Sequence, residues 1–562
     1  MDRGSLRRML KLLVNLMNFF SNIVYPRDRI KMLFLVLLVI VVYVPFLKNP
    51  LIFDDVPFFN AAIDHYANTL FHFDLRWLPY TTFGFTWVFF GEAPPVFRIQ
   101  NLLLHGVNVL LLLLVLRMWV KLFITDVSKE NIANWGAWLG ALVFACHPLA
   151  VYGVGYLIQR SILMATLFTL VMQLAYLRGL LEGDKRYMVL AVTAYFMALF
   201  SKEHSLIAPA ILLPLTWAIR AQNKLSSRVL IATWLGFALV GLLVVLRIKG
   251  LFGVPYEKDA AALFGEQALL QGTSALHLLS VLTQAGLFFK YCLLMLVPNP
   301  AWMSIDMREP FILTWKEWTS WIGLVAFVAY GAFALIFLLR GGRVALLGLA
   351  LLYPWCYFMA EFSSIRVQEI FVLYRSYLWL PGYMLLLPVL LSSLPSRKIM
   401  LVSALMVLLF VPLAWNRLWV FADKYRLWDD SVRLLHGEDR LGAHRIYFNR
   451  AQASAGVKNW DAAIADYKKS LAINSTYPEV NIALASAYSN SGRYLEALAE
   501  FDKVIADNPK NASAYYGKSF VLKNLHDMAG SIQQMEKSCQ FGLQQACIIV
   551  ALSQQQHKNV SP

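Results

Sequence analysis

The chain alternates between long apolar runs and short polar connections from about residue 30 to residue 421. After residue 423 the sequence becomes polar and helix-forming, which indicates a separate domain. A helix of roughly 20 apolar residues can cross a bilayer. The runs that we predict to span lie near residues 32–47, 99–116, 135–157, 161–177, 187–200, 205–219, 229–246, 320–339, 344–360, 377–394 and 399–421. The predicted fold class is therefore all-α: a polytopic transmembrane bundle of about eleven spans over residues 32–423, followed by a helical domain over residues 424–562.

Basic residues gather in connections that fall on alternate sides of this predicted bundle. Short loops rich in Lys and Arg face the cytoplasm. The formal net charge of +16 therefore reflects topology, and we expect no nucleic-acid partner. The basic positions that define the cytoplasmic side are Arg27, Arg29, Lys31, Arg117, Lys121, Arg178, Lys185, Arg186, Arg220, Lys224, Arg228, Arg340, Arg343, Arg397 and Lys398.

Residues 278–297 are also apolar, but we predict that they re-enter the membrane or lie at its surface. If they crossed, the two basic connections that follow would move to the outer side, against the charge rule. With this segment kept outside, loops 48–98 and 247–319 and the chain after residue 421 face the non-cytoplasmic side. Long loops on one side of a helical bundle commonly carry the chemistry.

The N-terminal residues 1–31 combine apolar side chains at helical spacing with basic ones such as Arg7, Arg8 and Lys11. This pattern predicts an amphipathic cytoplasmic segment on an anionic membrane surface. No small-x-small cleavage site precedes Arg27, which disfavours a cleaved signal peptide.

The polar domain repeats with a period of about 34 residues, the length of a tetratricopeptide repeat. We predict three such repeats, at about 444–477, 478–511 and 512–545, stacked as an α-solenoid that binds peptides or proteins. A spacer or oligomerisation element is the alternative. The positions in register are Ala451, Ala485 and Ser519, then Ala463, Ala497 and Ser531, then Tyr467, Phe501 and Met535.

Polar residues stand at the outer ends of the predicted helices, and each alone is weak evidence for a site. A single Arg or Lys there commonly snorkels to the interface, and a single His usually packs. Their order, however, matches a family. The motifs are Phe53-Asp54-Asp55, Arg76-Trp77-Leu78-Pro79, Leu104-His105-Gly106-Val107-Asn108, His147-Pro148, Gln159-Arg160, Ser201-Lys202-Glu203 and Tyr374-Arg375-Ser376-Tyr377-Leu378-Trp379-Leu380-Pro381.

In these motifs the sequence resembles polytopic glycosyltransferases of the GT-C class. It is most similar to the transmembrane and tetratricopeptide-repeat O-mannosyltransferases and their bacterial relatives, from about residue 30 to residue 545. It departs from them at Gln159-Arg160-Ser161, where the family commonly has Gly-Arg-Ala, and at His204, where Gln is usual. These departures leave the sugar open.

The resemblance implies transfer of a sugar from a polyprenyl-phosphate donor in the bilayer to a hydroxyl on the outer side. Asp54 or Asp55 would be the general base, the other carboxylate holding the acceptor or a cation. The donor phosphate would be bound by Arg160, Lys202 and Arg375. Supporting residues would be Arg76, His105, His147, Glu203, Tyr374 and Tyr377. Asp54, Asp55 and Glu203 also offer hard oxygen ligands for Mg or Mn, so the metal requirement is open.

We expect the acceptor to be a protein, such as a pilin-like or other secreted protein, that the repeats recruit. The expected location is a bacterial inner membrane with the site and repeats in the periplasm, the endoplasmic reticulum membrane and lumen being the alternative. The rival interpretations are an enzyme that acts on a glycolipid or cell-surface glycan, and a non-enzymatic membrane-anchored repeat scaffold. A transporter is disfavoured because the polar residues do not cluster at mid-membrane.

Cys539 and Cys547 stand in a setting that resembles the cysteine pairs of Sel1-like repeats. They can form a disulfide if this part of the chain lies in an oxidising compartment, or remain two separate buried thiols.

Overall fold

The structure, a computed structural model, describes residues 29–69, 74–124, 126–248, 272–367, 369–391, 393–475 and 478–560. It divides into two compact units: unit 1 is Met1–Ile305 with Phe311–Asp423, and unit 2 is Asp306–Pro310 with Lys424–Pro562. The described residues form helices and no β-strand, so the predicted all-α class is confirmed. The predicted amphipathic segment 1–31 lies outside the described residues except for its last three.

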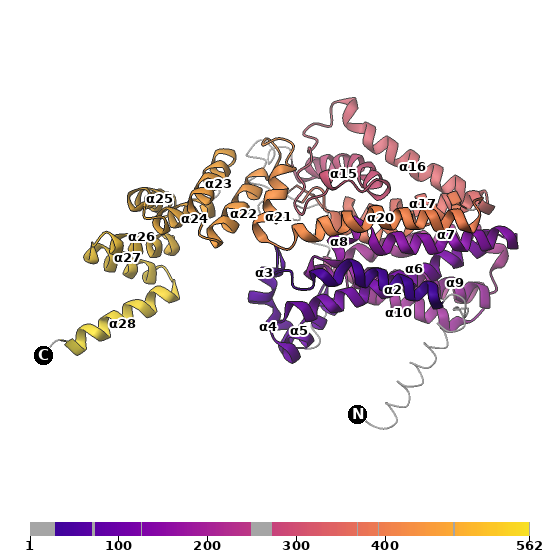
Figure 1. Ribbon diagram of the computed structural model, residues 1–562, viewed down its shortest axis with the longest axis horizontal. Coiled ribbons are helices and arrows are strands. Elements are labelled where there is room, and N and C mark those ends of the chain that lie inside the picture. The colour runs from indigo at the N-terminus through magenta and orange to yellow at the C-terminus, as the bar shows by residue number, and fades with distance from the viewer. Residues whose placement is uncertain are drawn as a thin grey trace, which may run out of the picture. The chain divides into compact units, whose positions relative to one another are not determined.

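Unit 1 contains, within the described residues, eight helices that are long and apolar enough to cross a membrane (Figure 1). A ninth candidate is the pair α7 (Val127–Cys146) and α8 (Pro148–Val154), which bends by 57°. Pro148 explains the bend, because proline cannot continue a helical hydrogen-bond ladder. The eight are α2 (Arg29–Tyr43, extended by Val44–Phe46), α6 (Pro94–Phe123), α9 (Arg160–Glu182), α12 (Ser227–Ile248), α15 (Gly272–Leu296), α16 (Ile322–Leu339), α17 (Gly342–Phe358) and α20 (Ser396–Val420).

The described residues thus offer eight candidate spans, α15 among them, or nine with the bent pair, and the count of about eleven stays a prediction. The predicted spans at 187–200, 205–219 and 377–394 are short or broken helices. The segments 205–219 and 377–394 contain prolines, for example Pro209 and Pro388, which interrupt regular helices, whereas 187–200 has no proline and forms one short helix. The observed elements are α10 (Lys185–Leu199), a 3₁₀ segment Glu203–Ile211 with α11 (Leu212–Ala218), and α18 (Leu380–Tyr383) with α19 (Leu386–Leu391).

Several long helices turn apolar side chains outward, as a lipid-facing surface requires. Only 17% of the apolar window of α12 and 22% of that of α16 is buried within the molecule. Exposed apolar surfaces of this extent are not found on proteins surrounded by water. Unit 1 therefore has the surface of a membrane protein.

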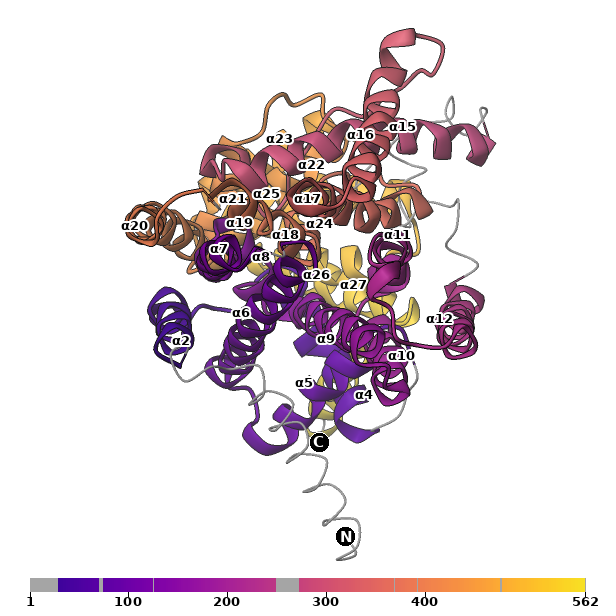
Figure 2. The ribbon, with the colours of Figure 1, turned by 90° about the vertical axis from the view of Figure 1, so that its right-hand side faces the viewer.

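Helix α15 is long enough to span but lies across the other helices (Figure 2). Helix α15 is bonded to backbone carbonyls that come after α17 in the sequence. His277 contacts the Phe362 carbonyl, Gln284 donates to the Ile370 carbonyl and Tyr291 donates to the Val372 carbonyl. That residues 278–297 re-enter the membrane or lie at its surface stays a prediction, because this helix is also long and apolar enough to span.

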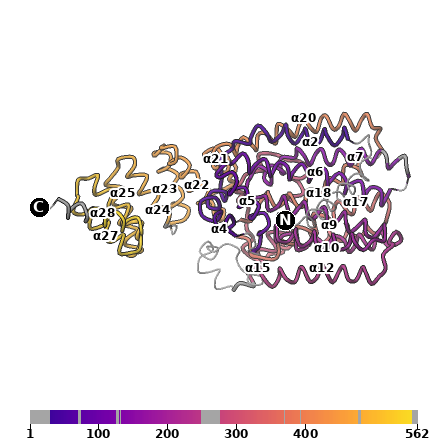
Figure 3. The backbone as a smooth tube through the Cα atoms, turned by 90° about the horizontal axis from the view of Figure 1, so that it is seen from below, coloured from indigo at the N-terminus to yellow at the C-terminus, as the bar shows by residue number. Residues whose placement is uncertain are grey.

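The connections predicted to be cytoplasmic lie together at one end of the bundle. Gln222 donates to the carbonyl of Leu122, and the backbone N–H of Lys224 donates to the carbonyl of Leu180. Figure 3 shows α4 (Ile63–Asn68) and α5 (Trp77–Phe90) at the other end of the parallel helices. The first long loop packs there through Phe58, Phe59 and their aromatic neighbours.

Unit 2 is a series of antiparallel helix pairs that coincide with the predicted repeats. The residues in register are buried in all three repeats. The small ones, in the sets that begin with Ala451 and Ala463, let paired helices approach closely, and the larger ones, in the set that begins with Tyr467, pack in the core. The helices are α21 (Lys424–Arg433), α22 (Ala443–Gly456), α23 (Trp460–Ile473), α24 (Pro478–Asn490), α25 (Tyr494–Asp507), α26 (Ala512–Asn524), α27 (Met528–Gln540) and α28 (Gln544–Val560).

Candidate functional site

A cavity of about 60 Å³ lies in unit 1 at the end of the bundle that carries α5. It brings together segments that are far apart in the sequence and that leave or enter long helices. Three of its lining residues, Asp54, Arg76 and Tyr374, belong to the predicted site. The complete lining is Asp54, Arg76, Tyr80, Ile158, Gln159, Ser161, Glu369 and Tyr374.

The backbone beside this cavity is strained at two positions. Among the described residues of unit 1, the non-glycine residues with left-handed backbone are Phe53 (φ 46°) and Arg76 (φ 66°). Phe53 directly precedes Asp54, and Arg76 lines the cavity. Such conformations are uncommon for residues with a side chain and gather at functional sites.

Asp54 and Asp55 have different environments. Asp54 lines the cavity, and its backbone N–H donates to the hydroxyl oxygen of Tyr156 at 3.0 Å. Asp55 is fully buried and accepts hydrogen bonds from the backbone N–H groups of Ile52, at 3.2 Å, and Ile158, at 2.8 Å. Asp55 thus fastens the loop to the segment 157–159, and Asp54 is the carboxylate that a ligand can reach.

Burial raises the pKa of Asp55 to about 7, although the nearby Arg98 guanidinium and the two backbone N–H groups act in the opposite direction. Arg98 itself donates to the carbonyls of Asn49, Pro50 and Gly155. The pair Asp55 and Arg98 therefore maintains the shape of the loop.

Lys202 is a buried cation behind the cavity wall. Its side chain is 1% exposed, and its ammonium lies 5.1 Å from the ring centre of Tyr374, which lines the cavity. No carboxylate among the described residues lies within ion-pairing distance of this ammonium. Burial, followed by the charge of Arg76, lowers the pKa of Lys202 to about 7. A buried cation without a carboxylate partner favours the binding of an anion.

Arg76 and Glu203 form a two-pronged ion pair beside Lys202. The Nε of Arg76 lies 3.0 Å from Oε2 of Glu203, and its Nη2 binds the other carboxylate oxygen. Burial alone would raise the pKa of Glu203, but Arg76 and then His204 hold that pKa well below its usual range. Glu203 is thus an ionised carboxylate that orients Arg76.

Arg375 is buried and bound to acidic partners. Its Nη1 lies 2.7 Å from Oε2 of Glu361, and its Nη2 lies 3.3 Å from Oε2 of Glu369. Burial acts to lower its pKa, yet Glu361 and the other negative groups raise that pKa well above the usual value. Arg375 therefore contributes to the cavity through Glu369, which lines it.

Arg160, the third predicted phosphate ligand, does not line the cavity, although its neighbours Gln159 and Ser161 do. Its buried guanidinium donates to Asn101, Thr82 and the carbonyl of Phe97. These bonds join the start of α9 to α5 and α6. Arg160 is therefore a buried residue that holds these helices together next to the cavity.

The remaining predicted residues lie in the helical core. His105 contacts the Tyr377 hydroxyl at 2.7 Å and the Ala145 carbonyl at 3.2 Å, and Tyr377 also accepts from Asn108. His147 caps α8 by accepting from the backbone N–H of Leu149, and its Nε2 contacts the Met295 carbonyl. These side chains hold helices together and do not reach the cavity lining.

Sequence reasoning missed Tyr80, Tyr156, Glu361 and Glu369 as members of this region. Glu361 carried a recognisable signal, because a charge at the end of the apolar run 344–360 is costly unless it serves a purpose. The two tyrosines carried none, since aromatic residues are abundant throughout the loops.

The predicted metal ligands do not fit a divalent cation. Within the described part of the chain, no group of three or more His, Cys, Asp or Glu side chains could hold a metal. Both carboxylate oxygens of Asp55 accept backbone hydrogen bonds, and both oxygens of Glu203 bind Arg76. Asp54 lines the cavity together with Glu369, which binds Arg375.

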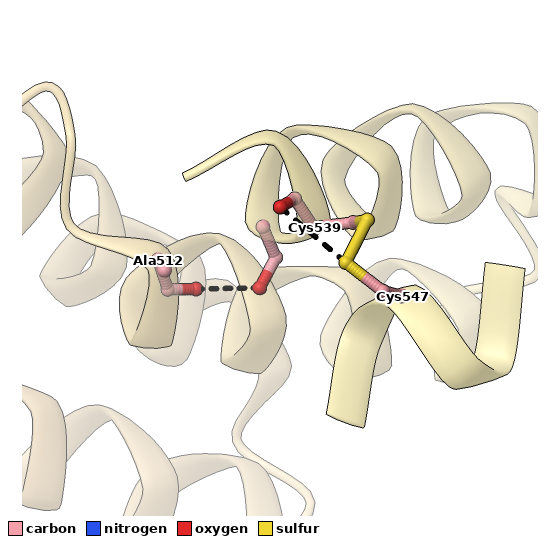
Figure 4. Close-up of a disulfide and its surroundings, with 4 residues drawn as sticks. Ala512, Cys539 and Cys547 are labelled. Atoms are coloured by element: carbon pink, nitrogen blue, oxygen red, sulfur yellow. Dashed lines mark hydrogen bonds between the residues drawn. A yellow bond between two sulfur atoms is a disulfide. The ribbon is translucent and has the colours of Figure 1, made fainter. Parts of the chain in front are cut away.

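In unit 2, Cys539 at the end of α27 and Cys547 in α28 form a disulfide (Figure 4). The neighbouring Ser538 hydroxyl donates to the carbonyl of Ala512, the first residue of α26, which pairs with α27. The other cysteines of the chain, Cys146, Cys292 and Cys356, are free and buried.

Residues 455–518 match the family model of the tetratricopeptide repeat. The match covers most of α23 to α26 and supports the repeat assignment made from the 34-residue period. A search of curated proteins finds no match to the chain. The function of unit 1 therefore rests on its own geometry and chemistry.

Proposed function

We propose that the chain is an integral-membrane glycosyltransferase of the GT-C class. It transfers one sugar from a polyprenyl-phosphate donor to a hydroxyl of an acceptor protein on the non-cytoplasmic side. The observation that carries this proposal is the cavity that has the Asp54 carboxylate in its lining and the Lys202 ammonium behind Tyr374. Such a site offers a base for a hydroxyl and a positive charge for a phosphate.

In the proposed reaction, the acceptor oxygen attacks the anomeric carbon of the sugar while Asp54 takes the hydroxyl proton. The bond between that carbon and the phosphate oxygen breaks, and its electron pair leaves with the polyprenyl phosphate. Lys202 and Arg76 offset the negative charge of the leaving phosphate. Because Lys202 has a pKa near 7, an anion beside it favours its protonated form.

The outer-side location follows from the charge of the connections. The basic loops predicted to be cytoplasmic lie at the end of the bundle opposite α5, and this charge pattern supports the proposal of an outer-side cavity. The disulfide of unit 2 agrees with an oxidising compartment on that side. The bacterial periplasm is the proposed compartment, with the endoplasmic reticulum lumen as its alternative.

A protein acceptor is proposed because unit 2 is a repeat array of the kind that binds peptides and proteins. A glycolipid or cell-surface glycan is the alternative acceptor for the same chemistry. A pilin-like or other secreted protein fits an outer-side location.

The test measures release of sugar from radiolabelled polyprenyl-phosphate sugars by purified protein. We expect one donor to be turned over, and Asp54→Asn to lower kcat by at least about 100-fold, since a general base contributes this much. Lys202→Met should raise KM for the same donor. Asp64→Asn, which removes an exposed carboxylate from α4, is the matched control and should leave turnover unchanged.

If no donor of any sugar type is turned over, with candidate acceptors present, the chain is a membrane-anchored repeat scaffold instead. Turnover that survives Asp54→Asn but is lost in Asp55→Asn would move the base to the second carboxylate.

A further inference from the structure

His204 occupies a buried position between two carboxylates. Its ring is 5% exposed, with Nδ1 3.5 Å from Oε1 of Glu203 and Nε2 3.2 Å from Oε1 of Glu361. Neither ring nitrogen makes a regular hydrogen bond, and each lies within ion-pairing distance of one carboxylate. Glu203 belongs to the same 3₁₀ segment as His204, whereas Glu361 follows α17.

These contacts complete a chain of ion pairs behind the cavity. From Arg76 the chain runs to Glu203, His204 and Glu361, and from there to Arg375 and Glu369. Its two ends, Arg76 and Glu369, both line the cavity. His204 connects the ion pair of Arg76 and Glu203 to the ion pair of Glu361 and Arg375, which lies after α17 in the sequence.

The chemistry of imidazole explains why a histidine suits this place. A protonated ring donates from both nitrogens, whereas a neutral ring turns an acceptor nitrogen toward one of its neighbours. With a carboxylate oxygen facing each nitrogen, the geometry fits the cationic ring. An uncharged residue here would leave Glu203 paired with Arg76 and Glu361 paired with Arg375, but it would remove the ring that connects the two pairs.

We propose that His204 is a positioning residue which, through Glu203 and Glu361, holds Arg76 and Glu369 in place around the phosphate of the donor. This inference rests on the proposed glycosyltransferase function. It assigns to His204 an effect on donor binding and not on the chemical step, because the ring does not line the cavity.

The experiment compares wild type, His204→Gln, Glu203→Gln and the double variant as full-length proteins. Donor KM and kcat are measured with the donor that wild type turns over. Binding of a long-chain polyprenyl monophosphate is measured by the rise in the thermal unfolding temperature of the same samples. His277→Gln removes another partly buried histidine, one that contacts the Phe362 carbonyl rather than a carboxylate, and serves as the matched control.

We expect His204→Gln to raise the donor KM and the dissociation constant of the monophosphate about tenfold, with kcat within about threefold of wild type. The effect of His204→Gln should shrink in the Glu203→Gln background, because residues that act through one another are not additive. His277→Gln should change neither constant.

The proposal is overturned if His204→Gln leaves both constants unchanged, or if it lowers kcat alone. It is also overturned if the effects of His204→Gln and Glu203→Gln on the donor KM are fully additive. If wild type neither turns over a donor nor is stabilised by the monophosphate, the glycosyltransferase function itself fails, and the role of His204 fails with it.

Discussion

Asp54 and Asp55 are neighbours in the sequence, yet they perform different tasks in the structure. One lines the cavity, and the other turns inward to two backbone N–H groups. The difference arises because Phe53 adopts a left-handed backbone and Asp55 begins a short helical turn. The sequence therefore identified the pair but contained no pattern that could rank its members.

Asp55 gives the protein a pH-dependent stability. Burial raises its pKa to about 7 in the folded state, whereas an unfolded Asp has a pKa of about 3.9. Because the folded state holds this proton more tightly, the stabilisation is complete below about pH 4 and is lost as the pH rises to about 7. The loss approaches about 1.4 kcal/mol per pH unit within this window.

Asp55→Asn removes this titration, so the stability difference between wild type and variant should be largest near pH 5 and smallest at pH 8. The measurement is the apparent unfolding temperature of both proteins in detergent across this range. A difference that does not change with pH would contradict the assignment. The variant should be less stable at low pH, since an amide oxygen cannot replace both carboxylate oxygens as acceptors.

The three basic residues predicted to bind phosphate also differ in the partners that their side chains contact. Lys202 keeps no carboxylate partner among the described residues, Arg375 is bound to Glu361 and Glu369, and Arg160 is used by Asn101, Thr82 and a carbonyl. Sequence position could place all three at helix ends. It could not show which side chains are already satisfied by protein partners, because those partners come from distant segments.

At the scale of elements, hydrophobic patterning predicted most long helices and failed where proline interrupts an apolar run. The segments 205–219 and 377–394 are as apolar as true spans, but they break into short pieces. The prediction that residues 278–297 do not span comes from the charges of later loops rather than from their own sequence. The length and composition of α15 alone would assign it as a span.

The disulfide is an element-scale constraint on the last helix. It closes a short loop between α27 and α28, with a sequence separation of 8. A loop of this size corresponds to a stabilisation of about 2–3 kcal/mol in the chain-entropy description. Cys547→Ser should therefore increase hydrogen exchange and protease cleavage in α28 while sugar release by unit 1 is retained.

Hydrogen exchange of intact and variant protein, together with non-reducing peptide mapping, provides the measurement. Two free thiols in wild-type protein from native membranes would contradict the bond and remove its support for an outer-side location. Equal exchange in α28 with and without the bond would show that packing alone holds this helix.

At the scale of the whole molecule, the chain passes between the two units more than once. Residues 306–310 belong to unit 2, where Arg308 is buried, contacts Asp306 at 2.6 Å and donates to the Leu441 carbonyl. Deleting residues 424–562 would therefore strip this segment of its packing partners. Point substitutions on the repeats separate the two proposed activities more cleanly.

The aromatic pair Tyr516 and Phe520 on α26 offers such a test. Their rings lie 4.9 Å apart, and Phe520 is 38% exposed although it is apolar. Partly exposed aromatic side chains are favoured anchors for protein partners. If the repeats recruit a protein acceptor, Tyr516→Ala with Phe520→Ala should reduce modification of cellular proteins at least about tenfold, while donor turnover with a small hydroxyl acceptor in vitro stays within about twofold.

Leu495→Ala is the matched control, because Leu495 is an exposed apolar residue on α25. It should leave both readouts unchanged. Protein modification that persists in the aromatic double variant would contradict recruitment through these two residues, whereas transfer to lipid or glycan with no protein modified in wild type would argue for a glycolipid or glycan acceptor. Loss of both readouts would mean that the substitutions disturb the fold, which circular dichroism of the variant would reveal. The comparison thus assigns the acceptor class by separating the chemistry of unit 1 from the recognition by unit 2.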